Sequence, residues 1–216
     1  MTGLEWLALL VYVSIYGYTC KHIDFSLLFQ HKHVQHVVFG AGVALFMLWN
    51  FRAGIYTGLD VHFLWLSALT LTLGFRYAVL ISGFVLLGIT AVGKESWEMF
   101  GANGVLGVLL PICVSYAVFS LVFHRVPRHL FIYVFLCAFF PGALVIAVKM
   151  LGIGGFYVLN DIHTWRIVFD NYEVLIPLLL FPEAMLNGMT MTLLIIYKPH
   201  WVYTWNDEQF FDPPPK

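Results

Sequence analysis

Charged residues are scarce in this sequence. They make up 11% of its 216 residues, whereas hydrophobic residues make up 61%, and the mean hydropathy is +0.84. Soluble globular domains carry about 25% charged residues, so the composition excludes that class and indicates a protein that crosses a membrane several times. The formal net charge of −1, without any basic run, also excludes a nucleic-acid-binding surface.

Cysteines are few and catalytic motifs are missing. Cys20, Cys113 and Cys137 are isolated, in or beside apolar runs and without C-x-x-C spacing, so we interpret them as small apolar residues. No serine-histidine-aspartate order, Walker loop, dinucleotide fingerprint or pair of catalytic carboxylates is present. We therefore expect no enzyme. A membrane enzyme with a histidine-bound metal or haem is a weaker alternative, because paired intramembrane histidines are not evident.

Long apolar runs predict the architecture. A helix that crosses a bilayer needs about 20 residues, so the chain has room for about seven spans. We predict an all-α fold: one polytopic transmembrane helical bundle over residues 1–216, with a polar tail over 198–216. The predicted spans cover residues 4–19, 37–52, 61–74, 77–92, 100–123, 130–150 and 174–197.

Basic residues in short loops predict the orientation. Arg125 and Arg128 follow the fifth span, and such residues favour the cytoplasmic side. Alternation of the spans then places the N-terminus outside and the C-terminus in the cytoplasm. The loop from Arg52 to His62 falls on the outer side.

That outer loop contains the first candidate site, with Arg52, Asp60 and His62 beside hydrocarbon. Ionisable groups there are costly unless paired, coordinated or hydrated. A neutral imidazole is the commonest protein ligand for nickel, cobalt, copper or zinc, so His62 is the leading ligand candidate. Asp60 could add an oxygen ligand or orient the imidazole, but we expect it to cap a helix that starts at Val61. A polar loop without any ligand is an equally weighted alternative.

A second candidate lies inside the last span. Glu183, Asn187 and Thr190 form one polar stripe on an otherwise apolar helix, which must face the bundle. An intramembrane carboxylate can relay protons, bind a cation, or pair with a basic group such as Lys149. Hydrogen bonds that lock the helices together are an alternative of equal weight.

Three histidines give a weaker metal signal. His31, His33 and His36 follow the pattern H-x-H-x-x-H, but on a helix only the last two share a face, which is irregular for a metal site. Met185 and Met189 also share a face, and thioethers bind Cu(I). We interpret these methionines as packing residues.

The sequence resembles the integral membrane, substrate-capturing subunit of energy-coupling-factor cobalt and nickel transporters, and looks closest to a divergent bacterial branch of predicted permeases. The resemblance covers about residues 49–211. It rests on four features: His62 twelve residues before Gly74, the segment GAN at 101–103, the segment FPEAMLNGM at 181–189, and the segment KPHWV at 198–202.

The resemblance implies seven spans, an outer N-terminus and a metal site. In the metal-transporting members the ion is held by the N-terminal amine, a histidine at position two, and a histidine that matches His62. Thr2 stands at position two here, so one ligand of that set is retained and cobalt or nickel specificity does not carry over directly. The resemblance also implies that Asn103 braces the outer loops, and that a transmembrane coupling subunit and an ATPase act as partners.

The leading hypothesis is a multi-pass protein of the bacterial inner membrane, surrounded by lipid, that captures a transition-metal ion. Cobalt or nickel is expected, with copper as an alternative, and no other cofactor is implied. The alternative is a non-transporting structural or assembly subunit of a larger membrane complex. The residues assigned to capture are the candidate ligands His62 and Asp60 and the supporting residues Arg52, Asn103, Glu183 and Asn187.

Overall fold

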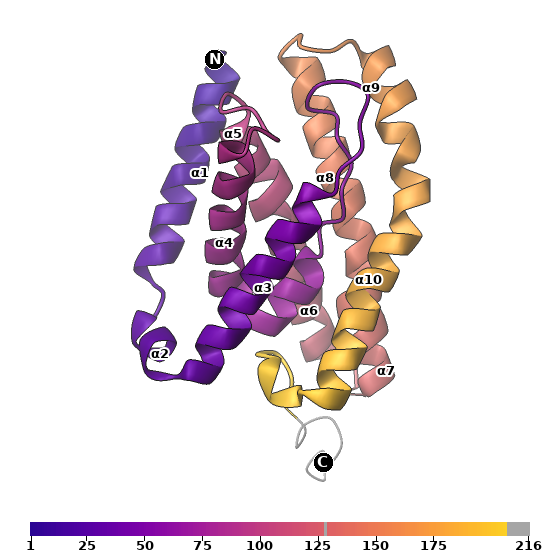
Figure 1. The fold of residues 1–216 in the computed structure, drawn as a ribbon. Coiled ribbons are helices and arrows are strands. Elements are labelled where there is room, and N and C mark those ends of the chain that lie inside the picture. Colours follow the sequence, from indigo (N-terminus) through magenta and orange to yellow (C-terminus); the bar gives the residue numbers. More distant parts are fainter. Residues whose placement is uncertain (128, 207–216) are drawn as a thin grey trace.

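The computed structural model describes residues 1–127 and 129–206, and these form a bundle of helices (Figure 1). The all-α prediction is confirmed, since this part of the chain contains no strand beyond one isolated bridge. The α-helices are α1 (Gly3–Lys21), α2 (Phe25–Gln30), α3 (Lys32–Asn50), α4 (Leu66–Ala91), α5 (Phe100–Ala102), α6 (Leu110–Arg125), α7 (Leu130–Ile132), α8 (Phe140–Leu159), α9 (Trp165–Asn171) and α10 (Ile176–Tyr197). The remaining helical turns are η1 (Asn103–Leu109), η2 (Tyr133–Phe139), η3 (Glu173–Leu175) and η4 (Pro199–Trp201).

Five helical stretches are long and apolar enough to cross a membrane: Gly3–Lys21, Leu66–Ala91, Phe100–Arg125, Leu130–Leu159 and Trp165–Tyr197. Large apolar side chains cover the outside of these helices, for example Phe84, Leu178 and Phe181. Such a surface suits a bilayer, in which backbone polar groups are satisfied within helices and apolar side chains face lipid. The chain is a multi-pass membrane protein.

Helix α4 reverses direction at Gly74. This residue has φ 76° and ψ 165°, outside the helical region. His62, before α4, and Glu95, after it, line the same cavity, which requires the halves 66–73 and 75–91 to run in opposite directions. Tyr77, just after the break, bonds Asp24 near the end of α1. The predicted runs 61–74 and 77–92 therefore correspond to two separate helical segments, of which the first is a half-helix of about 12 Å.

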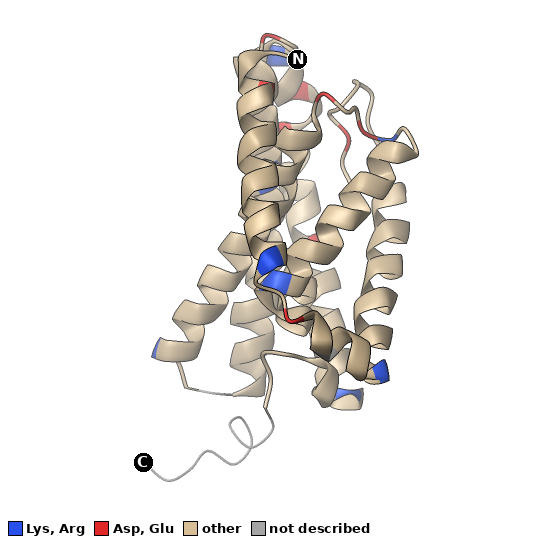
Figure 2. Cartoon of the chain, turned by 90° about the vertical axis from the view of Figure 1, so that its left-hand side faces the viewer, with Lys and Arg blue, Asp and Glu red and all other residues tan. Residues whose placement is uncertain are grey.

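With this reversal, the helices α1 and α3, the two halves of α4, and the stretches that contain α6, α8 and α10 alternate in direction along the bundle. The two ends of the chain accordingly lie at opposite ends of the bundle (Figure 1). Most lysines and arginines gather toward the C-terminal end and most acidic residues toward the N-terminal end (Figure 2). Arg128, used above to predict the orientation, lies outside the described residues.

Two prolines inside long helical stretches follow widened turns. The π-helical turns η1 and η2 end shortly before Pro111 and Pro141. A proline ring clashes with the carbonyl four residues earlier and removes one hydrogen bond, and a turn with i→i+5 bonding accommodates both effects. The helices continue beyond each proline as α6 and α8.

The start of the predicted polar tail packs against the bundle. Val202 and Trp205 are buried, and the backbone N–H groups of Tyr203 and Thr204 donate to the carbonyls of Thr72 and Leu71. Those carbonyls end the first half of α4, where the break at Gly74 removes their helical partners. The first residues of the predicted polar tail thus pack against the bundle; residues 207–216 lie outside the described part.

Candidate metal-binding cavity

The loop between α3 and α4 carries Arg52, Asp60 and His62 and forms a short hairpin. Ala53 and Val61 exchange two backbone hydrogen bonds, with N···O distances of 3.0 and 2.8 Å. This pairing brings the backbone of Arg52, next to Ala53, close to that of Asp60 and His62, on either side of Val61.

The tip of the hairpin is held against the end of α8 and the loop that follows it. Gly58 has φ +81°, and a Cβ at this position would overlap the phenol oxygen of Tyr157, so the approach requires glycine. His163 Nε2 donates to the carbonyl of Thr57 at 3.1 Å. The tip of the loop is therefore packed against a neighbouring part of the bundle.

Helix α4 starts at Leu66, not at Val61 as predicted. Trp65 occupies the N-cap position with φ 56° and makes no capping hydrogen bond through its side chain. Asp60 lies well before this start, so its expected capping role is wrong. Its carboxylate lies 4.0 Å from Arg52 instead.

Side chains of α10 accept hydrogen bonds from the backbone N–H groups at the start of α4. Glu183, which is 0% exposed, accepts hydrogen bonds from the backbone N–H groups of Leu64 at 2.9 Å and Trp65 at 2.7 Å. Asn187 accepts the N–H of Ala68 at 2.8 Å and donates to Glu183. The polar stripe of α10 thus satisfies backbone donors that a helix start leaves open.

Two further observations define the stripe. The indole N–H of Trp65 donates to Thr190 at 2.9 Å, which helps to hold the left-handed backbone of Trp65. Among the described residues, Glu183 forms no ion pair with Lys149, the basic partner considered from the sequence. The stripe joins α10 to the loop that carries His62.

A small cavity of about 20 Å³ lies beside His62. This volume holds one water molecule or one bare ion. The cavity is lined by Trp49, Arg52, His62, Leu86, Glu95, Asn103, Gly107, Val108 and Lys149.

His62 presents one nitrogen with a free lone pair. Its side chain is 7% exposed and packs beside Trp49. Nδ1 lies 3.1 Å from the carbonyl oxygen of Phe63; because a carbonyl only accepts, Nδ1 carries the proton and Nε2 the lone pair. Burial lowers the pKa of His62 well below its usual range, and the charges of Lys149 and Arg52 lower it further. The imidazole is therefore neutral, the form that binds metal ions.

Arg52 connects the elements around the cavity. Its guanidinium pairs with Glu95 and donates through Nε to the carbonyl of Trp49 at 3.0 Å, while Asn103 donates to Glu95 at 2.8 Å. Burial raises the pKa of Asp60, Arg52 opposes this shift, and Glu95 adds to it. The network joins α3, the loop before α5 and η1 at one point.

The first residues of the chain start α1. The side chain of Thr2 accepts the N–H of Glu5 at 3.3 Å, and Glu5 accepts the N–H of Thr2 at 2.7 Å, which forms a capping box. None of the residues 1–5 lines the cavity beside His62. His62 is thus the one imidazole among its lining residues.

The histidine cluster predicted as a second metal site is dispersed. His31 precedes α3, and the ring of His33 lies 5.0 Å from that of His200, centroid to centroid. Across residues 1–127 and 129–206, no three histidine, cysteine, aspartate or glutamate side chains are grouped as a metal site. The same finding applies to His62 and Asp60, so a bound ion would need ligands of another type or a rearrangement.

Two charged residues of the cavity were not assigned to it from the sequence. Glu95 lies in a polar break between spans, and Lys149 was considered only as a partner of Glu183. Both are ionisable groups at the ends of apolar runs, which is the signal that could have identified them. Their position beside His62 depends on how the helices pack.

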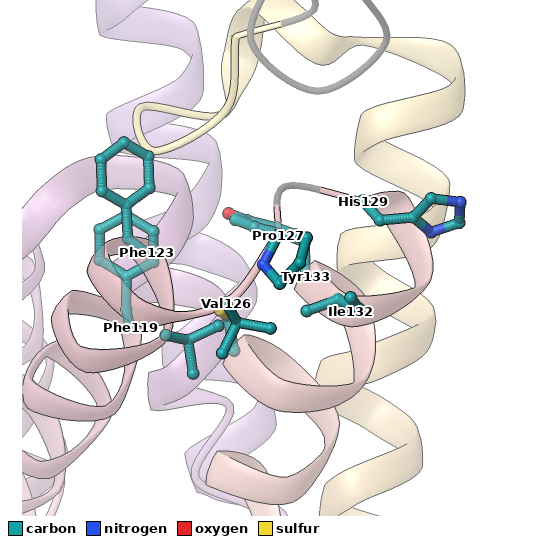
Figure 3. Close-up of a pocket in the computed structure, with 9 residues that line it drawn as sticks. Phe119, Phe123, Val126, Pro127, His129, Ile132 and Tyr133 are labelled. Carbon is teal, nitrogen blue, oxygen red and sulfur yellow. The ribbon is translucent and has the colours of Figure 1, made fainter. Parts of the chain in front are cut away.

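A smaller cavity of about 10 Å³ lies at the other end of the bundle, near the turn between α6 and α7 (Figure 3). Its walls are mostly apolar, with Phe119, Val126 and Pro127 among them. The ring of His129 points away from this centre (Figure 3), and its Nδ1 accepts the N–H of Phe131. This cavity offers no comparable set of ligands.

Two solved structures share the fold. A truncated transition-metal transporter superposes with a TM-score of 0.73 at 16% sequence identity, over 89% of this chain and 94% of that chain. A transition-metal transporter superposes with a TM-score of 0.68 at 16% identity, over 88% of this chain and 86% of that chain. At these identities the likeness is one of fold.

No curated protein sequence gives a significant match. The family of cobalt uptake substrate-specific transmembrane regions (CbiM), by contrast, matches residues 3–201, nearly the whole chain. The chain belongs to this family, and is thereby a membrane substrate-capture component for a metal ion.

Proposed function

We propose that the chain captures a transition-metal ion of the cobalt or nickel type in the cavity beside His62, with Nε2 of His62 as the ligand that selects it. One observation carries the proposal: the hydrogen bond from Nδ1 to Phe63 leaves the Nε2 lone pair on a buried, neutral imidazole. A backbone carbonyl in this position is the usual partner of a metal-binding histidine. The adjacent cavity has the volume of one ion.

The other polar residues support capture by holding the cavity in shape. Arg52, Glu95 and Asn103 connect its walls, and Glu183 and Asn187 fix the chain just after His62. Asp60 lies near Arg52 and is close enough in sequence to join the ion after a small movement of the loop. Preorganised side chains reduce the entropy lost on binding.

The proposal also covers the orientation of the chain in the membrane and its partner subunits. The gathering of lysine and arginine toward the C-terminal end (Figure 2) supports a cytoplasmic position for that end, in a bacterial inner membrane. The cavity then opens to the outer side, where an ion would arrive. We expect a transmembrane coupling subunit and an ATPase to act with this chain, as in other transporters of energy-coupling-factor type.

The test is the metal content of protein purified in detergent and incubated with cobalt or nickel, measured by plasma mass spectrometry. Wild type is expected to retain close to one ion per chain and His62→Ala to lose it. His36→Ala is the matched control, because His36 is exposed on α3 and does not line the cavity. Equal retention by wild type and His62→Ala, with both eluting as folded protein, would remove His62 from the site.

The second candidate function is that of a non-transporting subunit in a larger membrane complex. It is favoured by the two positive charges of Arg52 and Lys149 beside the single imidazole. A stable co-purifying partner, together with no metal after incubation, would support this function over capture.

A further inference from the structure

Lys149 is the lining residue of the cavity whose role the proposed capture at His62 does not account for. It lies on α8, is 6% exposed and lines the cavity with His62. Within the described residues its ammonium makes no hydrogen bond or ion pair; its recorded contact is with the ring of Tyr172, 5.8 Å from Nζ to the ring centroid. The hydroxyl of that tyrosine is itself buried without a partner. A buried ammonium in this state is costly, which indicates a role.

The charge of Lys149 acts where a cation would bind. Arg52 is matched by its direct ion pair with Glu95, so its charge is largely compensated at close range. Lys149 has no such direct partner, and it lines the same small cavity as His62, so its charge acts on an ion that binds there. Lys149 would repel a divalent ion bound at the imidazole about twice as strongly as it repels a proton there, because the ion carries two positive charges.

All divalent ions feel this repulsion, but they differ in the bonds that can offset it. Mg²⁺ and Ca²⁺ are bound almost entirely by charge, through several oxygen ligands, and the carboxylates of Asp60 and Glu95 near this cavity already face Arg52. Cobalt, nickel and copper gain in addition from coordination by an imidazole nitrogen. An added positive charge therefore penalises every divalent ion, but only the transition metals have the imidazole bond to offset it.

We propose that Lys149 is the specificity-determining residue of the cavity, whose positive charge excludes Mg²⁺ and Ca²⁺ and leaves room only for an ion that His62 coordinates. The inference rests on the proposed capture at His62 and adds the basis of its selectivity.

The experiment measures cobalt retained by detergent-purified protein in the presence of a large excess of Mg²⁺, and Mg²⁺ binding directly by calorimetry. Lys149→Met keeps most of the side-chain length and removes the charge, and Lys149→Gln is a second neutral variant. Lys149→Arg is the matched control that keeps the charge. We expect the neutral variants to bind Mg²⁺ about tenfold or more tightly than wild type, and excess Mg²⁺ to displace their cobalt. Wild type and Lys149→Arg should retain it.

The outcomes separate this inference from the proposed function. If the neutral variants discriminate as wild type does, or lose cobalt without Mg²⁺ present, the charge filter is wrong; the second result would make Lys149 a ligand. If both neutral variants fail to fold while Lys149→Arg folds, the charge is structural and the inference is overturned. If His62→Ala retains cobalt, capture at His62 fails, and a gain of Mg²⁺ binding in Lys149→Met would still establish the charge effect.

Discussion

The carboxylate of Glu183 in α10 accepts the backbone N–H of Trp65 at 2.7 Å, across a sequence separation of 118 residues. A helix usually takes its cap from a side chain within its own first turn. Here the cap comes from another helix, and the residue it holds immediately follows the segment that carries His62. The carboxylate that could have relayed protons is fully engaged by backbone donors and Asn187.

Glu183→Gln is expected to destabilise the bundle by about 3 kcal/mol, because the amide loses the charge and one acceptor and leaves a buried N–H without a partner. Thermal unfolding in detergent measures the change. Glu98→Gln is the control, since Glu98 is exposed. Equal midpoints for the two variants would contradict the capping role.

Arg52→Lys is expected to loosen the hairpin over residues 51–65. Lysine keeps the charge but cannot contact Glu95 and the carbonyl of Trp49 at once. Hydrogen exchange should become faster at the backbone amides of Ala53 and Val61, which pair in this hairpin. Arg166→Lys, at an exposed site, should leave exchange there unchanged; no acceleration in Arg52→Lys would show that the charge alone holds the loop.

Stability is expected to fall as the pH falls through the range in which histidine titrates, in part because of His62. Its pKa is lowered in the folded protein, so below about pH 6.5 the unfolded chain binds a proton that the folded chain does not. The free energy of unfolding therefore decreases toward acid. Thermal midpoints at about pH 7.5 and about pH 5.5 should differ more for wild type than for His62→Gln; parallel changes would mean that His62 is not held neutral.

Gly74→Ala is expected to destabilise more than Gly93→Ala. Both glycines have positive φ, +76° and +80°, so both substitutions strain the backbone by about 1–2 kcal/mol. A Cβ at Gly74 would also lie 2.9 Å from the ring of Tyr203, whereas nothing lies within 4 Å of one at Gly93. The difference between the two thermal midpoints measures the contact with Tyr203. No difference would indicate that the C-terminal segment moves aside freely.

The features that could be predicted from the sequence are those set by a local pattern of residues. Apolar runs identified the helices, and the cost of charge beside hydrocarbon singled out Arg52, Asp60 and His62. The break at Gly74 was visible as a short span followed by a glycine. Each of these signals lies within a few residues of the feature it predicts.

The start of α4 could not be found in this way, because its cap comes from Glu183 and no capping residue precedes Leu66. The same reason applies to the cavity. Lys149 and Glu95 reach His62 only through packing of α8 and the loop before α5, and the partner of His33 is His200 rather than its neighbours in sequence.

The half-helix 66–73 depends at both ends on parts of the chain that are synthesised much later. The open N–H groups at and just before its start bond Glu183 and Asn187, and its open carbonyls accept the N–H groups of Tyr203 and Thr204. Unsatisfied backbone groups are not tolerated in hydrocarbon, so we expect this segment to remain at the aqueous boundary until translation has delivered α10 and the residues after it. The order of assembly then differs from the order of synthesis, and His62 reaches its final position among the last residues of the protein to do so.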